Sequence, residues 1–153
     1  MTPDNSLHEG LRFAGPSKTL NDAHFLLFSG ITGDVHRSHY DVEYAKRTRF
    51  GKPLAHGLLL ASMTALGASE IRERLDGFIF VEQGCRYLRP AVVGDTIRPQ
   101  FVLERIWQEG HRVFYRFATT LVNQRDETLL EGFHVYQIVA PHRAEKEHDA
   151  RGS

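Results

Sequence analysis

The chain has 153 residues and no net formal charge, because 19 Lys and Arg balance 19 Asp and Glu. A chain of this length buries about two-thirds of its unfolded surface and folds as one domain. Without a basic block interleaved with aromatic residues, the composition predicts neither a nucleic-acid partner nor a membrane surface. The one cysteine, Cys85, excludes an internal disulfide. A single cysteine fits a reducing compartment, and the N-terminus shows no secretory pattern. We therefore expect a cytoplasmic protein.

The first third of the chain predicts short elements separated by glycines. Residues 1–10 are polar and are expected to be flexible, and residues 11–20 can form a short strand. Asn21 is suited to cap a helix that runs through residue 28 and is ended by Gly30 and Gly33. Asp41 can cap a second helix over residues 42–47, whose end is basic.

Residues 54–71 are almost entirely apolar or small, with no charge before Glu70. A surface helix would show a polar residue every three or four positions, and this segment barely does. The pattern predicts one long helix that is buried nearly all round. Its length and its polar interruptions do not favour a membrane span.

Beyond residue 77 the pattern changes to that of β-strands. Four runs rich in aromatic and β-branched residues, 78–88, 96–107, 112–122 and 129–139, are separated by turn-forming residues and predict an antiparallel meander. Pro99 indicates an edge position or a bulge in the second run. Residues 141–153 are charged and are expected to form a disordered tail.

These elements predict an α+β fold in which an antiparallel sheet wraps around a long central helix, the hot-dog fold, over a single domain of residues 11–140. A curled sheet of this size leaves an edge strand open, and pairing two sheets in a symmetric dimer would cover it. We therefore expect a homodimer, or a higher oligomer built from dimers.

The loop before the second helix contains the residues best suited to chemistry. Asp34 and His39 lie five positions apart and close in sequence to His56 and Gly57. A carboxylate and an imidazole can together activate water and protonate carbon. Taken alone, however, an Asp after Gly is more often part of a turn, and a loop His is more often solvated.

The segment from residue 28 to residue 57 resembles the MaoC-like dehydratase family, which includes the (R)-specific enoyl-CoA hydratases. The resemblance rests on three motifs in order: F-x-x-x-[ST]-G-D-x-N-P-x-H, then D-x-x-x-A-x-x-[ST]-x-F, then A-H-G at the start of the central helix. The matching residues are Phe28, Thr32, Gly33, Asp34, His39, Asp41, Ala45, Thr48, Phe50, Ala55, His56 and Gly57.

The resemblance implies that Asp34 and His39 are the catalytic pair and that the backbone amide of Gly57 helps to bind a thioester carbonyl. It implies reversible syn hydration of a trans-2-enoyl thioester to an (R)-3-hydroxyacyl thioester. The substrate would be an acyl-CoA thioester, with coenzyme A carried as part of the substrate and no separate cofactor or metal. His56 is expected to orient the loop or to contact the substrate.

This chain departs from the family pattern at His36 and Arg37, which stand where Asn and Pro are expected. The loss of Pro removes a fixed φ, and the loss of Asn removes a side chain that could brace the loop. His36 can supply the bracing hydrogen bond. Arg37 can select substrates by pairing with a carboxylate or phosphate, or it can be a solvated surface residue.

Three other functions are compatible with the sequence. Asp34, His36, His39 and His56 could ligate zinc in a metal hydrolase, although their spacing fits no common zinc motif. A hot-dog acyl-CoA thioesterase would direct water at the thioester carbon instead. A non-catalytic subunit that binds acyl thioesters is the third alternative, in which His36 and Arg37 would mark a decayed site.

Overall fold

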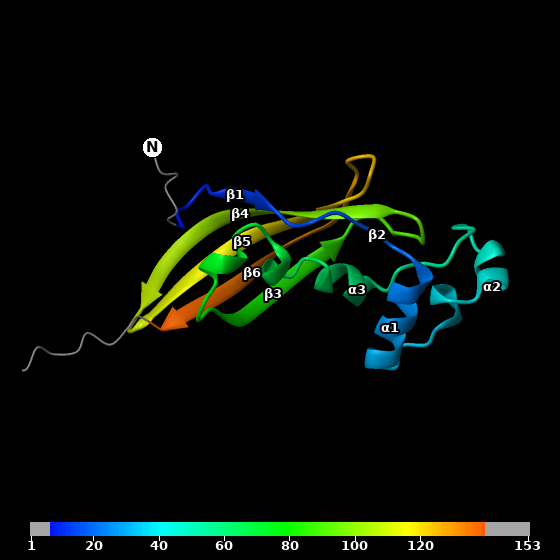
Figure 1. Ribbon diagram of the computed structural model, residues 1–153, viewed down its shortest axis with the longest axis horizontal. Coiled ribbons are helices and arrows are strands. Elements are labelled where there is room, and N and C mark those ends of the chain that lie inside the picture. Colours follow the sequence, from blue (N-terminus) through cyan, green and yellow to red (C-terminus); the bar gives the residue numbers. More distant parts are fainter. Residues whose placement is uncertain (1–6, 140–153) are drawn as a thin grey trace, which may run out of the picture.

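The computed structural model describes residues 7–139, which fold into one curved antiparallel sheet with short helices at one end (Figure 1). The strands are β1 Arg12–Ala14, β2 Lys18–Thr19, β3 Ile79–Tyr87, β4 Thr96–Glu109, β5 Arg112–Val122 and β6 Thr128–Val139. The α-helices are α1 Asp22–Thr32, α2 Val42–Lys46 and α3 Gly57–Ser62. Three 3₁₀ turns complete the fold: η1 Arg37–His39, η2 Leu66–Ala68 and η3 Arg72–Arg74.

The sheet has the strand order β1-β4-β5-β6-β3, with β2 pairing the start of β4. The predicted meander is therefore correct for β4, β5 and β6 but wrong for β3, which pairs β6 rather than β4. The segment between β3 and β4 is not a hairpin turn. It bonds instead to the chain just before α3, where Ala55 N–H donates to Ala91 O at 2.9 Å and Leu54 bridges Val92.

Of the two alternatives predicted for Pro99, the edge position holds locally and the bulge is wrong. Pro99 pairs Leu121 of β5 on one side, but on the other side it falls between the residues of β4 that pair β1 and those that pair β2. The irregularity in β4 falls between Leu103 and Arg105 instead. The Pro99 carbonyl accepts from Gly15 N–H at 3.0 Å, on the side where β1 has just ended. In an antiparallel strand the N–H and C=O of one residue point to the same side. The missing N–H of Pro99 therefore costs no hydrogen bond to β5.

The long central helix predicted over residues 54–71 is wrong, because α3 covers only Gly57–Ser62. Hydroxyl groups end it: Ser62 Oγ donates to Leu59 O at 2.7 Å, and Thr64 Oγ1 donates to Ala61 O at 2.6 Å. Ala65 then adopts an extended conformation before η2. Side-chain hydroxyls that bond nearby carbonyls compete with the helical pattern. The predicted burial on all sides is wrong as well: Leu59, Leu60, Leu66 and Ile71 are buried, but Leu58 is 70% exposed. The segment forms one short helix followed by 3₁₀ turns, with one side toward the core.

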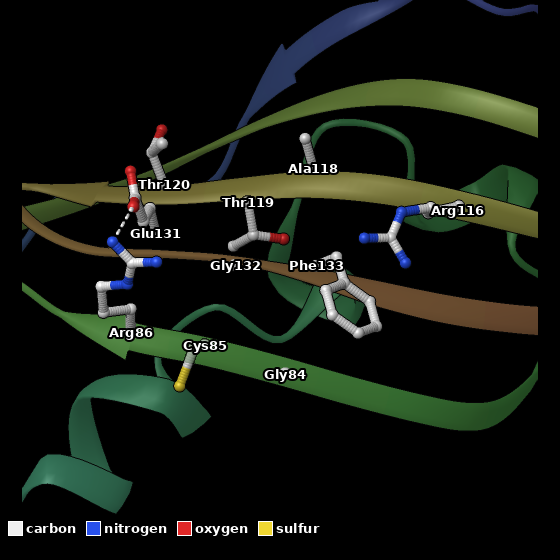
Figure 2. A pocket seen from close by; sticks show the side chains of 10 residues that line it. All are labelled: Gly84, Cys85, Arg86, Arg116, Ala118, Thr119, Thr120, Glu131, Gly132 and Phe133. Carbon is white, nitrogen blue, oxygen red and sulfur yellow. Dashed lines mark ion pairs between the residues drawn. The ribbon is translucent and has the colours of Figure 1, made fainter.

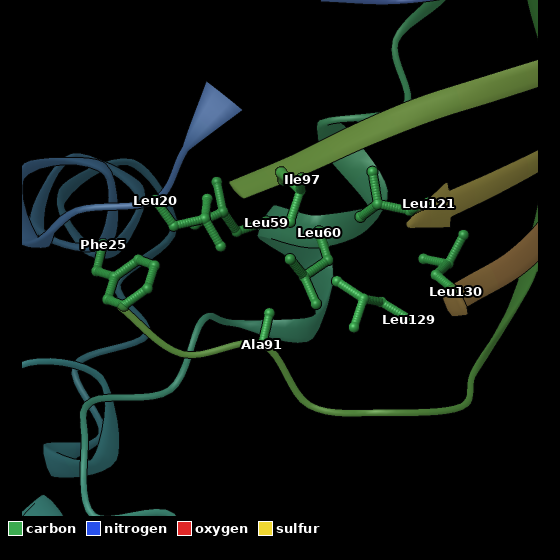
Figure 3. Packing of buried hydrophobic residues seen from close by; sticks show 9 residues of the cluster. All are labelled: Leu20, Phe25, Leu59, Leu60, Ala91, Ile97, Leu121, Leu129 and Leu130. Atoms are coloured by element: carbon green, nitrogen blue, oxygen red, sulfur yellow. The ribbon is translucent and has the colours of Figure 1, made fainter. Parts of the chain in front are cut away.

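The core lies between the sheet and the segment that contains α3. Figure 3 shows Leu59 and Leu60 of α3 directed at side chains from the sheet and from α1. This cluster consists of Leu20, Phe25, Leu59, Leu60, Ala91, Ile97, Leu121, Leu129 and Leu130, with Cys85 partly buried against it. A second cluster contains Phe13, Leu66, Ile71, Phe101, Leu103 and Phe117. The sheet thus curls around α3, as the hot-dog fold requires.

Both predicted helix caps are confirmed. Asn21 Oδ1 accepts from His24 N–H at 3.2 Å at the start of α1, and Asp41 Oδ1 accepts from Tyr44 N–H at 2.8 Å at the start of α2. Of the N-terminal segment predicted to be flexible, residues 7–10 are described, and Gly10 N–H donates to Leu103 O at 2.8 Å. The predicted C-terminal tail, residues 141–153, lies outside the described residues.

Candidate active site

The loop that carries Asp34 begins where α1 ends. Gly33 closes α1 in the left-handed conformation, with φ 77°, and its N–H donates to Ser29 O at 2.8 Å. Glycine adopts this conformation without a steric penalty, so the chain can turn sharply away from the helix axis. Asp34 follows immediately, with half of its side chain exposed. The end of α1 therefore sets the direction of the carboxylate.

The two oxygens of Asp34 have different surroundings. Oδ1 accepts from His36 N–H at 3.4 Å, which is the turn interaction expected of an Asp after Gly. Oδ2 lies 3.8 Å from His39 Nε2, whose side chain is only 13% exposed. That separation is too long for a direct hydrogen bond. It is short enough for a single water oxygen to bond both atoms.

A backbone carbonyl fixes the tautomer of His39. Its Nδ1 lies 2.7 Å from Leu54 O, and a carbonyl can only accept. Nδ1 therefore carries a proton, so in the neutral form of the ring it is Nε2, the nitrogen facing Asp34, that is free to accept one. This assignment follows from the hydrogen-bond partners. His39 is thus oriented to take a proton from a group lying between it and the carboxylate.

His56 is buried directly behind His39. The two rings stack with centroids 3.7 Å apart and planes 17° apart, and Phe28 packs against His56 from α1. His56 Nε2 lies 3.0 Å from Ser29 Oγ and 3.2 Å from the carbonyl oxygen of Asp34. Burial, and secondarily the neighbouring His39, lower the pKa of His56. A neutral His56 thus joins α1, the loop and the start of α3.

Gly57 is the first residue of α3, next to a pocket of about 270 Å³ lined mainly by apolar side chains. Tyr87 of β3 closes one side, with Cζ 3.4 Å from the position that a Cβ on Gly57 would occupy. Burial, and then contact with Cys85, raise the pKa of Tyr87 to about 12. A substrate carbonyl could approach the helix terminus here because no side chain stands at residue 57.

His36 and Arg37 both make contacts within the loop. His36 caps η1: its Nδ1 accepts from Ser38 N–H at 3.3 Å and lies 2.9 Å from Ser38 Oγ. Arg37 forms an ion pair with Asp41 at 2.7 Å. The structure therefore brings Asp34, His39 and His56 together, whereas His36 and Arg37 lie beside them on the turn that carries His39.

Two residues of this site were not predicted from the sequence. Ser29 bonds His56 from the buried face of α1, and Tyr87 packs over Gly57 from a strand that begins more than twenty residues later. Neither has a local sequence signal, because each meets its partner only through the packing of distant elements. The spacing of Phe25 and Ser29, four residues apart on α1, marks the buried side of that helix.

Asp34, His39 and His56 each offer a ligand atom within 4.8 Å of the others, so a metal site must be considered. An imidazole binds a metal through a lone pair that lies in the ring plane. The planes of His39 and His56 are nearly parallel and stacked, so one ion cannot lie in both. The three residues do not fit a shared metal ion, which disfavours the metal-hydrolase alternative.

A larger pocket, of about 570 Å³, lies on the sheet and contains none of the predicted site residues. Figure 2 shows its lining from β3, β5 and β6, with Arg86 and Glu131 joined as an ion pair at 3.9 Å. Arg116 lies over the ring of Phe133, with its guanidinium carbon 3.7 Å from the centroid. Its charged groups have partners within the sheet, and it offers no acid–base pair.

The fold and the loop define a hot-dog protein with a carboxylate–imidazole site beside the first turn of its central helix. Comparison with known proteins agrees. The chain belongs to the MaoC-like domain family, whose model matches residues 6–123. No helix within residues 7–139 is both long and apolar enough to cross a membrane.

Several relatives carry related names. The (R)-specific enoyl-CoA hydratase of Rhodospirillum rubrum is 27% identical over 113 residues, covering 72% of this chain and 76% of the relative. The 3-hydroxybutyryl-CoA dehydratase of Methylorubrum extorquens is 28% identical over 117 residues, which cover 75% of this chain and 71% of the relative. The structure of an (R)-hydratase from A. caviae superposes with a TM-score of 0.77 at 24% identity, covering 87% of this chain and 98% of that one. The fold class predicted from the sequence is confirmed.

Proposed function

We propose that this protein catalyses the reversible syn hydration of a trans-2-enoyl-CoA to an (R)-3-hydroxyacyl-CoA. The observation that carries the proposal is the position of His39 Nε2, 3.8 Å from Asp34 Oδ2, in a ring whose Nδ1 donates to Leu54 O. Membership of the MaoC-like family, and relatives named as hydratases and dehydratases of CoA thioesters, support it.

In this mechanism Asp34 and His39 hold one water molecule between them. The water oxygen bonds to C3 of the substrate while one of the two groups takes a proton from the water. A proton from the same pair then reaches C2, on the same face, so the double bond is consumed and the pair returns to its starting state. General acid–base catalysis of this kind contributes about 10²–10⁴-fold to a rate.

Negative charge develops on the thioester oxygen during the attack and needs a hydrogen-bond donor. The backbone N–H of Gly57, at the first position of α3, is proposed as that donor. The adjoining pocket of about 270 Å³ offers apolar contacts for the acyl thioester. His56 and His36 are proposed to support the loop rather than to transfer protons, and no resident cofactor or metal is required.

A homodimer is proposed as the active form. β3 pairs only β6 among the described strands, and its exposed residues include Ile79, Phe80 and Val81. An exposed apolar edge strand is a liability that pairing with a second copy removes. Light scattering after size exclusion would give the mass. A monomer at micromolar concentration would contradict this part of the proposal.

The cytoplasmic location stays a prediction.

The decisive experiment follows the absorbance of the enoyl-thioester conjugation in crotonyl-CoA, together with free thiol. The wild type should consume the conjugation without releasing thiol. Asp34→Asn keeps the acceptor for His36 N–H but removes the charge, and should lower the rate about 10²–10⁴-fold. Asp22→Asn, an exposed carboxylate at the start of α1, is the matched control and should retain the rate.

Three outcomes would reject the assignment. Thiol release without loss of the conjugation would identify a thioesterase. Full turnover by both Asp34→Asn and His39→Ala would show that this pair does not carry the reaction. Wild-type inactivity on crotonyl-CoA and on longer, branched and carboxylated enoyl thioesters would favour the non-catalytic subunit.

A further inference from the structure

Arg37 and Asp41 join the two ends of the turn that carries His39. Arg37 Nε and Nη2 donate to Asp41 Oδ2 at 3.0 and 2.7 Å. The backbone closes the same segment, because Asp41 N–H donates to Arg37 O at 2.9 Å. Side chains and backbone thus hold residues 37–41 together from both sides.

Asp41 also connects this turn to α2. Its second oxygen, Oδ1, accepts from Tyr44 N–H at 2.8 Å and caps the helix, and the guanidinium of Arg37 lies 5.0 Å from the centroid of the Tyr44 ring. The Tyr44 amide, and then Arg37, lower the pKa of Asp41. One carboxylate therefore fixes the turn to the helix that follows it.

The other side of the turn is attached to the segment before α3. Ser38 O accepts from Leu54 N–H at 2.9 Å, and His39 Nδ1 donates to Leu54 O at 2.7 Å. The direction of His39 Nε2 toward Asp34 thus depends on two attachments of η1. One is to Leu54, and the other, through Arg37 and Asp41, is to α2.

We propose that Arg37 is a positioning residue for His39, and that its ion pair with Asp41 supplies the rigidity that a proline would give at this position. The inference rests on the proposed function, since it assigns Arg37 a part in the proton transfer through His39. In this proposal Arg37 orders the loop and does not bind a substrate carboxylate or phosphate. Two of its nitrogen atoms are already bonded within the loop.

A double-mutant cycle separates the two roles. Arg37→Met removes the guanidinium and keeps an unbranched apolar stem. Asp41→Asn keeps an oxygen that can cap α2 but places an amide N–H, in place of the second oxygen, toward Arg37. The cycle is completed by the double variant. Lys46→Met removes the ion pair of Lys46 with Glu43, which is 2.6 Å long and lies on α2, and serves as the control.

Two kinds of measurement are made on each protein. The first gives kcat and KM for an enoyl-CoA that the wild type hydrates, and the second gives the hydrogen-exchange rates of the His39 and Asp41 amides. The ion pair is solvent-exposed, so the effect is modest. Each single variant should lower kcat about two- to fivefold with KM unchanged, and should speed exchange by a similar factor. The double variant should be no worse than either single one, because both remove the same interaction.

Three results would overturn the proposal. A raised KM in Arg37→Met but not in Asp41→Asn would make Arg37 a substrate contact. Additive effects in the double variant would show that the two residues act independently. Unchanged kcat and exchange in both single variants would leave the pair without a positioning role. If the wild type hydrates no enoyl-CoA, the proposed function fails, and the exchange rates alone decide whether the pair orders the turn.

Discussion

His134 should make the stability of this protein sensitive to acid. The residue lies on β6 in the core, 4% exposed, and its Nε2 is 3.1 Å from Thr64 Oγ1. The Thr64 hydroxyl donates to Ala61 O, so it accepts from His134 Nε2, which leaves Nδ1 buried with no hydrogen-bond partner among residues 7–139. A proton on Nδ1 would have no acceptor. Burial accordingly lowers the pKa of His134 from 6.5 to about 4.

The sign and size of the effect follow from linkage. Because the folded pKa lies below the unfolded value, the unfolded chain binds the proton first as the pH falls. The stability contribution is complete above pH 6.5 and is lost between pH 6.5 and about 4. Between pH 7.5 and pH 5.0 these two pKa values correspond to a loss of about 2 kcal/mol in the free energy of unfolding.

The assay is urea unfolding at these two pH values. His134→Gln replaces the ring by a side chain that can still donate to Thr64 and does not titrate. Its loss of stability between pH 7.5 and 5.0 should be smaller than that of the wild type by about 2 kcal/mol. His111→Gln, an exposed histidine in the β4–β5 turn, should match the wild type. An equal loss in wild type and His134→Gln would refute the reasoning.

Two further predictions use glycines of the fold. Gly57→Pro removes the proposed N–H donor at a helix position that tolerates proline, and should lower kcat about 10²–10³-fold in the crotonyl-CoA assay. Gly57→Ala keeps the N–H and should retain far more activity than Gly57→Pro. A Cβ on Gly132 would run into the backbone of Gly84, so Gly132→Ala should cost more than about 3 kcal/mol in urea unfolding. Gly67→Ala, where the space is open, should cost little, and equal effects of the two substitutions would contradict this account of the sheet.

Predictions that depend on a few neighbouring residues were confirmed. Asn21 and Asp41 cap their helices because an Asx side chain bonds an amide three residues ahead, whatever the rest of the chain does. The strand over residues 112–122 was predicted with the correct bounds because its alternating apolar residues form one continuous run with turn-forming residues on either side. In the loop, the resemblance to the MaoC-like family predicted that Asp34 and His39 form a pair, and the structure places Oδ2 of one 3.8 Å from Nε2 of the other.

The two main errors have different origins: the end of α3 depends on local side-chain hydrogen bonds, and the place of β3 depends on a distant segment. The apolar composition of residues 54–71 predicted burial on all sides, whereas Leu58 is exposed, and it did not show that hydroxyl–carbonyl bonds end the helix at Ser62. The position of β3 beyond β6 depends on the segment after it, whose Ala91 carbonyl bonds Ala55 near the start of α3. A strand's own sequence does not identify its neighbour in the sheet.

The sequence by itself determined the chemical groups of the candidate site, the caps that begin its helices and the glycine that turns the chain into Asp34. These depend on interactions within a few residues. Only the tertiary structure decided how the groups are oriented. Leu54 O selects the tautomer of His39, His56 stacks behind it, and Asp41 holds Arg37 within the loop. Such orientations come from hydrogen bonds and packing between segments whose relative positions are set only when the sheet closes around α3.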